Sequence, residues 1–205
     1  MLKKAIKGNK FIQWGGVLLI VCGLGLLGYY VYEKVRIGSY QKQLRSAYED
    51  LSFELPADET FDDVVISKRQ QMRLVISKIN VDLIVQAGDV YDDALQDRGP
   101  VHFECSAMPS TEPGNVAVAA HRGSYWGFFT DLDQLVEGDQ LFLDVEGYRF
   151  IYETEWIRIV EPDDWSVIDP TDYPALTLQT CHPKNVRGTH RLIVRAKLDR
   201  VTRAS

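Results

Sequence analysis

The sequence predicts a mainly-β domain, a closed or nearly closed barrel with short helices, that follows one N-terminal transmembrane helix. Two patterns predict this class. Many short, β-branched, apolar segments separated by turn residues follow Met72, with few helical segments among them. In addition, no charged residue occurs from Trp14 to Tyr32. The length of 205 residues suits one anchored domain with its own core. We expect three regions: a cytoplasmic tail and anchor over 1–36, a juxtamembrane helix and linker over 37–70, and the barrel over 71–205.

The anchor is predicted from the uncharged run, which is long enough to cross a hydrocarbon core of roughly 30 Å as a helix. Trp14 and the tyrosines near its end suit the two interfaces. A cleaved signal peptide is the alternative, but the run is long and no small-x-small site follows it. The lysines that precede the run favour a cytoplasmic N-terminus, although Lys34 and Arg36 follow it. We therefore expect a single pass with the barrel outside the cell.

Charge is distributed unevenly along the chain. The formal net charge is −6, yet residues 1–36 carry six basic side chains against Glu33 alone, so the remainder is strongly acidic. An acidic domain repels phosphate backbones. Nucleic acid is therefore not an expected partner, and the basic end belongs beside a membrane.

The elements follow from local periodicity. Tyr40, Leu44, Tyr48 and Leu51 recur on one face, which predicts a helix over 37–53 that packs against the barrel, before an acidic linker over 54–70. A short helix is expected over 91–96, and a turn or short helix over 128–135. The expected strands lie at 72–79, 81–86, 115–120, 140–145, 148–160, 175–181 and 191–198, with a hairpin at Glu146-Gly147.

Three polar residues lie at ends of these strands, namely His121, Cys181 and Arg191. A thiolate can attack an amide carbonyl, a histidine can protonate the leaving amine, and an arginine can stabilise an oxyanion. A lone cysteine is more often a small buried hydrophobe. The three cysteines form no disulfide framework, because Cys22 lies in the apolar run and only Cys105 and Cys181 remain.

The segments around these residues make the site more specific, because the sequence resembles the sortase family. Thr177-Leu178-Gln179-Thr180-Cys181 matches that family's Thr-Leu-x-Thr-Cys signature, and Arg191 follows ten residues later at the start of an apolar strand. Upstream, the resemblance continues through 99–103, 113–122, 129–133 and 138–139, and it spans about residues 72–198.

The resemblance implies an eight-stranded sortase-type barrel and a Gram-positive cell-surface cysteine transpeptidase, without a cofactor or a metal. Its substrates would be surface proteins with a Leu-Pro-x-Thr-Gly-type sorting signal, cleaved between Thr and Gly through a thioacyl intermediate on Cys181. His121 would protonate the leaving amine, Arg191 would hold the substrate carbonyl, and Thr180 would help to bind substrate. A cell-wall precursor would supply the acceptor amine.

Several alternatives stay open. Residues 189–196 resemble the pilin-polymerising group, whose acceptor is a pilin lysine, whereas 160–164 and His121-Arg122 look more like the groups labelled D and E. A cysteine endopeptidase and a non-enzymatic binding module are the rival functions. Cys105 is either a regulatory thiol or incidental. A metal site built from His102, His182 and His190 is not expected, because no ligand pair has metal-binding spacing.

Overall fold

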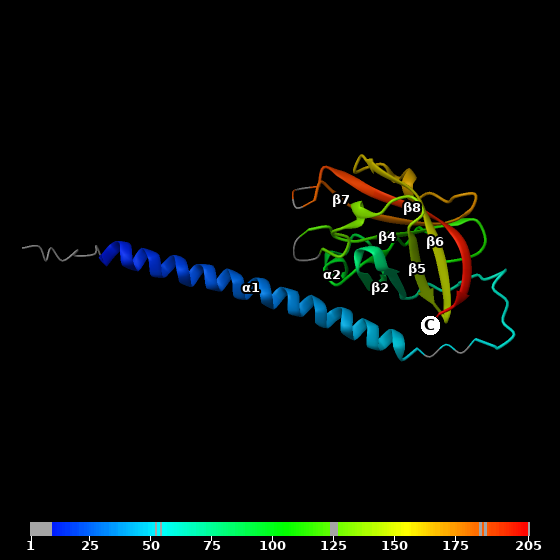
Figure 1. The fold of residues 1–205 in the computed structure, drawn as a ribbon, viewed down its shortest axis with the longest axis horizontal. Coiled ribbons are helices and arrows are strands. Elements are labelled where there is room, and N and C mark those ends of the chain that lie inside the picture. Colours follow the sequence, from blue (N-terminus) through cyan, green and yellow to red (C-terminus); the bar gives the residue numbers. More distant parts are fainter. Residues whose placement is uncertain are drawn as a thin grey trace, which may run out of the picture.

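The chain folds into a barrel that is approached by one long helix. The computed structural model describes residues 10–51, 53, 55–123, 127–184, 186 and 188–204, with only the backbone described for 10–12. Helix α1, Lys10–Glu49, combines the apolar run and the juxtamembrane segment in one continuous element, about 60 Å long. Figure 1 shows it projecting well beyond the barrel. The basic residues Lys3, Lys4 and Lys7 lie outside the described residues.

Eight strands form a closed barrel, as the sequence analysis expected. Their order around the barrel is β1-β2-β3-β4-β7-β8-β6-β5. The pairs β2–β3 and β4–β7 are parallel, and the other neighbouring strands run antiparallel. The strands are β1 Met72–Ile76, β2 Val81–Ala87, β3 Val101–His102, β4 Gly114–Ala119, β5 Gln140–Val145, β6 Tyr148–Val160, β7 Pro174–His182 and β8 His190–Arg203.

Short helices occupy the connections between strands. The segment over 72–79 is not one strand, because it turns into a 3-10 helix, η1 Ser77–Ile79, before the left-handed Asn80. The expected helix at 91–96 is α2 Asp93–Gln96, and the turn at 128–135 contains η2 Leu132–Gln134. A further 3-10 helix, η3 Trp165–Ile168, lies between β6 and β7.

The β5–β6 hairpin follows the prediction closely. Val145 pairs with Tyr148, which leaves a two-residue connection. Both of its residues have positive φ, 51° at Glu146 and 81° at Gly147. This geometry is what a tight two-residue hairpin with right-handed strand twist needs.

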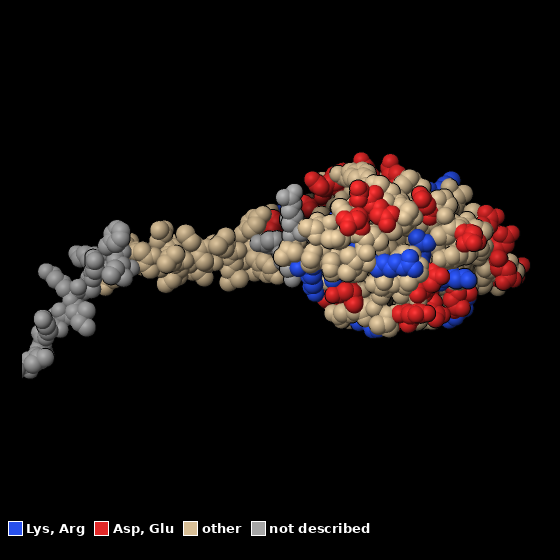
Figure 2. Space-filling model, turned by 90° about the horizontal axis from the view of Figure 1, so that it is seen from above, with Lys and Arg blue, Asp and Glu red and all other residues tan. Residues whose placement is uncertain are grey.

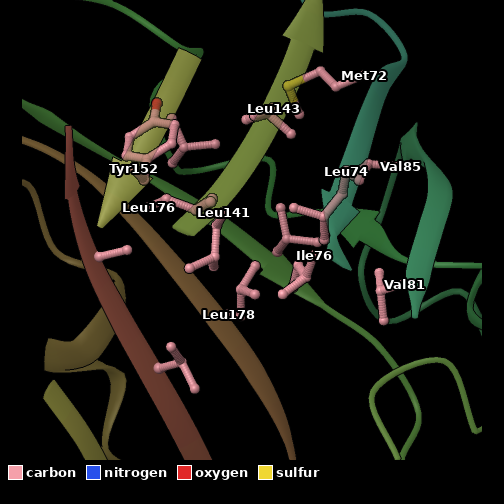
Figure 3. Packing of buried hydrophobic residues seen from close by; sticks show 14 of the residues in the cluster. Met72, Leu74, Ile76, Val81, Val85, Leu141, Leu143, Tyr152, Leu176 and Leu178 are labelled. Carbon is pink, nitrogen blue, oxygen red and sulfur yellow. The ribbon is translucent and has the colours of Figure 1, made fainter. Parts of the chain in front are cut away.

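The barrel interior is an apolar core. Side chains that alternate along each strand point inward, among them Leu74 of β1, Leu143 of β5 and Leu178 of β7, each fully buried. Figure 3 shows these side chains filling the space between the strands. Burying a side chain of this size stabilises the fold by about 1.5–3 kcal/mol.

The surfaces of helix and barrel differ in charge. The apolar run of α1 is exposed, and the helix is long and apolar enough to cross a membrane. Figure 2 shows a long uncharged stretch of helix beside a barrel studded with acidic side chains. An exposed apolar surface of this length in water would be an aggregation liability, so a lipid environment suits it.

The chain from α1 to β1 passes the end of the barrel away from Cys181. Phe53 and Leu55 lie against Gly147, and Arg203 donates to the carbonyl of Leu55 at 2.8 Å. Tyr148 pairs with Arg203 at one end of the β6–β8 ladder, and Val160 pairs with Arg191 at the other. The start of this connection therefore lies far from the strand ends that carry the candidate residues, whereas Arg69, closer to β1, donates to the carbonyls of Glu104 and His102 beside the larger surface cavity described below.

Candidate active site

Strands β4, β7 and β8 present one outer face of the barrel, and the candidate residues lie on it. Leu176 and Leu178 of β7 point into the core, so the alternate residues Gln179 and Cys181 point outward. Cys181 pairs directly with Arg191 across the antiparallel β7–β8 ladder. Residues opposite each other in such a ladder project from the same face, so the thiol and the guanidinium are neighbours.

His121 reaches the same face through the parallel β4–β7 pairing. The Ala120 N–H donates to the carbonyl of Gln179 at 3.1 Å, which continues the ladder one residue beyond β4. Ala120 packs in the inner core, so the next side chain, His121, lies on the outer face. Two strand registers therefore bring together residues that are 60 and 10 positions from each other in sequence.

A cavity of about 160 Å³ joins the three residues. His121, Cys181 and Arg191 line it together with Thr180, Tyr91 and Trp165. Cys181 is a half-buried free thiol. The arrangement places a nucleophile, a proton donor and a cationic oxyanion partner around one space, which is the set that acyl transfer through a thioester needs.

A second, larger cavity of about 520 Å³ continues along this face. It shares Tyr91, Phe103 and Trp165 with the first cavity and extends to Cys105 and Ile168. Its apolar lining suits an extended peptide with apolar side chains.

Two walls enclose these cavities. The β6–β7 wall is residues 161–173 and includes η3, and the β2–β3 wall is residues 88–100 and includes α2. They meet where the rings of Tyr91 and Trp165 pack edge-on, with centroids 6.2 Å apart. Substrate bound along the outer face would lie between these walls.

A buried polar network fastens the β6–β7 wall to the sheet. Asn115 of β4, 1% exposed, donates to the carbonyls of Val167 at 3.1 Å and Asp169 at 3.0 Å. Arg195 of β8 donates to the same Val167 carbonyl at 2.7 Å. The hydroxyl of Thr177 donates to the Asn115 side-chain oxygen at 2.7 Å. These bonds satisfy buried groups that would otherwise be costly.

Arg122 is a residue of the site to which sequence reasoning gave no role. Its guanidinium is 2% exposed and donates to Asp133 at 2.8 Å, to Nδ1 of His182 at 3.0 Å and, more weakly, to the carbonyl of Cys181 at 3.4 Å. It therefore ties the segment after His121 to the segment after Cys181. Its place directly after His121 was visible in the sequence, but its burial was not.

The hydroxyl of Thr180 makes a contact that the sequence did not suggest. It is buried and donates to the carbonyl of Ala120 at 2.7 Å, so it joins the residue before Cys181 to the residue before His121. Thr180 is also among the residues that line the small cavity, and its expected contact with substrate stays a prediction.

Gly188 lies directly against Cys181. A methyl group built on Gly188 would come within 2.8 Å of the Cys181 Cβ and 3.2 Å of its Sγ. Both distances are shorter than ordinary van der Waals contact. A side chain at this position would crowd the thiol.

Of the remaining histidines, His182 and His190 are cross-strand partners on β7 and β8, whereas His102 lies on β3. Cys105 is an exposed free thiol on the larger cavity. His102 is buried beneath the β3–β4 connection, His182 accepts from Arg122, and His190 lies 3.5 Å from Glu161. Among the residues that the structure describes, no group of three or more His, Cys, Asp or Glu side chains could hold a metal.

His102 shapes the wall of the larger cavity from below. Its Nε2 donates to the carbonyl of Ala107 at 2.9 Å, because a carbonyl can only accept. Burial lowers the pKa of His102 to about 4. The imidazole is therefore neutral at physiological pH and braces the connection that carries Phe103 and Cys105.

Comparison with known proteins finds sortases by both a family model and individual relatives. A sequence model of the Sortase domain matches residues 74–199. Sortase D of Bacillus subtilis (strain 168) is 34% identical over 116 residues, which are 56% of this chain and 56% of that protein. Sortase A of Bacillus anthracis is 25% identical over 180 residues, which are 80% of this chain and 84% of that protein. The matched segment thus spans little more than half the length of the first of these relatives.

Solved structures agree with the sequence relatives. The Clostridium perfringens sortase D5 transpeptidase superposes with a TM-score of 0.62 at 26% identity and covers 78% of this chain and 98% of its own. Sortase E1 of Streptomyces coelicolor, solved with a tripeptide in its active site, has a TM-score of 0.60 at 25% identity over 66% of this chain and 91% of its own.

Proposed function

The chain belongs to the sortase family, and from that premise we propose that it is a membrane-anchored cysteine transpeptidase with Cys181 as nucleophile. Its substrates would be surface proteins that carry a Leu-Pro-x-Thr-Gly-type sorting signal. One observation carries the proposal: Cys181, its cross-strand partner Arg191, and His121 line one cavity on one face of the barrel.

The first half of the reaction forms a thioester. With the thiol proton transferred to His121, the Cys181 thiolate attacks the carbonyl carbon of the signal's Thr, and negative charge develops on the carbonyl oxygen. The guanidinium of Arg191 stabilises this oxyanion, a role its fixed N–H donors suit. His121 gives a proton to the Gly nitrogen, the C–N bond breaks, and the peptide that begins with Gly leaves.

The second half transfers the acyl group. An acceptor amine attacks the thioester carbon, His121 takes a proton from the amine, and the C–S bond breaks to release the Cys181 thiolate, which regains its proton from His121. The new amide bond joins the surface protein to the acceptor. Arg122 and Thr180 support both halves, because their bonds hold the His121 and Cys181 segments in register.

The anchor and the acceptor complete the proposal. The exposed apolar helix supports a single-pass anchor, with a cytoplasmic N-terminus and an extracellular barrel. We favour anchoring to a cell-wall amine over pilin polymerisation. This choice is supported by the connection from α1 to β1. Its start packs at the far end of the barrel, its later part bonds to the carbonyls of His102 and Glu104, and none of its described residues lines the cavity at Cys181.

Product analysis tests the function. The full chain in detergent micelles is mixed with Leu-Pro-x-Thr-Gly peptides, alone, with a glycine-type amine, or with a pilin-type lysine peptide, and the products are identified by mass spectrometry. We expect cleavage between Thr and Gly, with amide product increasing as the glycine-type amine is added. An endopeptidase would give only free acid, and a pilin-polymerising enzyme would prefer the lysine peptide.

Two cysteine variants provide the matched controls. Cys181→Ala should reduce cleavage by roughly 10³-fold or more, because removing a nucleophile removes the covalent route. Cys105→Ala should leave cleavage within about twofold of the unmodified chain, since Cys105 is outside the small cavity. Cleavage by Cys181→Ala would contradict the assignment.

A further inference from the structure

A short segment, residues 97–99, lies between the long N-terminal helix and the candidate histidine. On one side, Asp97 reaches His121, with Oδ1 3.4 Å from Nε2. On the other side, Arg98 and Gly99 contact α1. Both contacts link parts of the chain that are far apart in sequence.

The Asp97 carboxylate is suited to orient the imidazole of His121. Both side chains are about one third exposed, 36% for Asp97 and 30% for His121, and His121 lines the small cavity together with Gln96, the residue before Asp97. A carboxylate beside one ring nitrogen favours one orientation of the ring. Cys181 and Arg191 face the same cavity from β7 and β8, so the orientation of the ring decides which of these groups it meets.

Local structure alone holds Asp97 weakly. Asp97 is the C-cap of α2, and its N–H donates to the carbonyl of Asp93 at 2.9 Å. The helix has only four residues, far below the length at which a helix is stable in water by itself. Gln86 of β2 adds one tie, donating to the carbonyl of Leu95 at 2.9 Å. The position of the carboxylate therefore needs support from outside α2.

Helix α1 supplies that support through Gln41. The side-chain oxygen of Gln41 accepts from the N–H of Ile84 at 2.9 Å, and its nitrogen donates to the carbonyl of Arg98 at 2.8 Å. The guanidinium of Arg98 also lies over the ring of Tyr40, 4.9 Å from its centroid. One amide thus bridges β2 and the residue that follows Asp97.

Gly99 makes this bridge possible. A methyl group on Gly99 would come within 2.1 Å of the Gln41 nitrogen. Only glycine leaves the amide enough room at this position. Gly99→Ala would therefore displace the Gln41 side chain without changing Gln41 itself.

We propose that Asp97 is a positioning residue for His121, and that α1 braces it through Gln41. The inference rests on the proposed function, since it concerns the same histidine. It gives the N-terminal helix a second role. The segment that would anchor the protein also completes the active site, so the anchored chain and an isolated barrel differ in their catalytic rate.

Asp97 variants test the first part of the proposal. With the full chain and a sorting-signal peptide, Asp97→Ala should lower kcat about tenfold and leave KM within twofold, because the carboxylate acts on His121 and not on the peptide. Asp97→Glu should recover kcat to within about threefold of the unmodified chain. Asp93→Ala, which removes an exposed carboxylate from the same short helix, is the matched control and should have no effect. Unchanged kcat in Asp97→Ala, or an equal loss in Asp93→Ala, would overturn the assignment.

Helix variants test the second part. Gln41→Ala and Gly99→Ala should each lower kcat about threefold, with little further loss when either is combined with Asp97→Ala. Arg45→Ala is the control, since Arg45 also joins α1 to the barrel, but its side-chain bonds go to Asp82 and not to residues 97–99. Equal losses in Arg45→Ala and Gln41→Ala would refute the Gln41 route.

A readout that does not use the reaction separates this inference from the proposed function. Hydrogen exchange of the amides in residues 93–99 should be several-fold faster in Gln41→Ala and unchanged in Arg45→Ala. If hydrogen exchange of these amides is unchanged in Gln41→Ala, the proposal that Gln41 supports this segment is refuted, whatever the activity of the variant. A chain that cleaves no sorting-signal peptide, yet shows faster exchange in Gln41→Ala, would refute the function while preserving the brace.

Discussion

The two walls of the active-site cavity are fastened in different ways. The β6–β7 wall is held from beneath by Asn115 and Arg195, buried side chains of the barrel itself. The β2–β3 wall has one bond of this kind, from buried Gln86 of β2 to the carbonyl of Leu95, and is held in addition from outside by the amide of Gln41 on a helix that is not part of the barrel. The first wall therefore depends on the fold of the domain, and the second depends also on how the anchor helix docks. Changes to the first should affect stability strongly, and changes to the second should affect mainly the rate.

Asn115→Ala should have the largest effect, because it breaks the buried fastening of the β6–β7 wall. The carbonyl of Asp169 and the hydroxyl of Thr177 lose their Asn115 partner, and the carbonyl of Val167 keeps only the bond from Arg195. We expect the free energy of unfolding to fall by about 2–4 kcal/mol and the KM for the peptide to rise several-fold. Urea denaturation and steady-state kinetics measure both. Gln140→Ala, an exposed amide on β5, is the control, and a loss below about 1 kcal/mol in Asn115→Ala would contradict the wall's internal fastening.

The second-largest expected effect is a loss of folding stability at low pH, caused by buried His102. The pKa of His102 is about 4 in the folded state against 6.5 for the ordinary group, so the unfolded state binds the proton first as pH falls. The neutral imidazole therefore contributes its full share to the free energy of unfolding above pH 6.5. This contribution is lost as the pH falls from 6.5 to about 4, a change of roughly 3 kcal/mol. Urea denaturation at several pH values measures it. His102→Gln should show a shallower dependence over this window, and identical slopes would contradict the assignment.

Gly188→Ala should act on the chemistry without acting on either wall. The added methyl group would crowd Cys181 at 2.8 and 3.2 Å, so the thiol must move away from its present position. We expect acylation by the peptide to slow about tenfold, with the free energy of unfolding within about 1 kcal/mol of the unmodified chain. Stopped-flow measurement of the first turnover tests this. An unchanged acylation rate would contradict this expectation, because it would mean that the connection between β7 and β8 moves to accommodate the methyl group without displacing the thiol.

Gln41→Ala should have the smallest effect on stability, which completes the comparison with Asn115→Ala. The amide is half-exposed, so water can replace its bonds to Ile84 and Arg98. We expect the free energy of unfolding to change by less than about 1 kcal/mol, in the same urea experiment. A loss as large as that of Asn115→Ala would mean that the helix is part of the barrel's cooperative unit and that the two walls do not differ.

Much of the barrel could be predicted because its strands have strong local patterns. The apolar runs before His121 and Cys181 are long enough to predict strands, and the Glu146-Gly147 pair predicts the hairpin that the structure contains. Strand β3 could not be predicted, since two residues carry no periodicity. The sequence also treats the anchor and the juxtamembrane helix separately, whereas they form one helix through Glu49.

The site was predictable where residues lie in register and unpredictable where it depends on contacts between distant segments. Cys181 and Arg191 are cross-strand partners in a hairpin-like pair, so their spacing carried information. Asp97 and Gln41 have no motif, and their roles arise only when α1 docks beside β2. Arg122 shows the intermediate case, because its place in the chain was clear while its buried contacts with Asp133 and His182 were not.

The central claim is that Cys181 carries the acyl group, and intact-mass analysis tests it most directly. The full chain is mixed with a sorting-signal peptide without an acceptor amine, quenched in acid, and digested to locate the adduct. The account predicts a mass increase equal to the peptide up to its Thr residue, less one hydrogen, on the fragment that contains Cys181. Cys105→Ala should form the same adduct and Cys181→Ala none. An adduct on Cys105, or cleavage of the peptide by Cys181→Ala, would contradict the account.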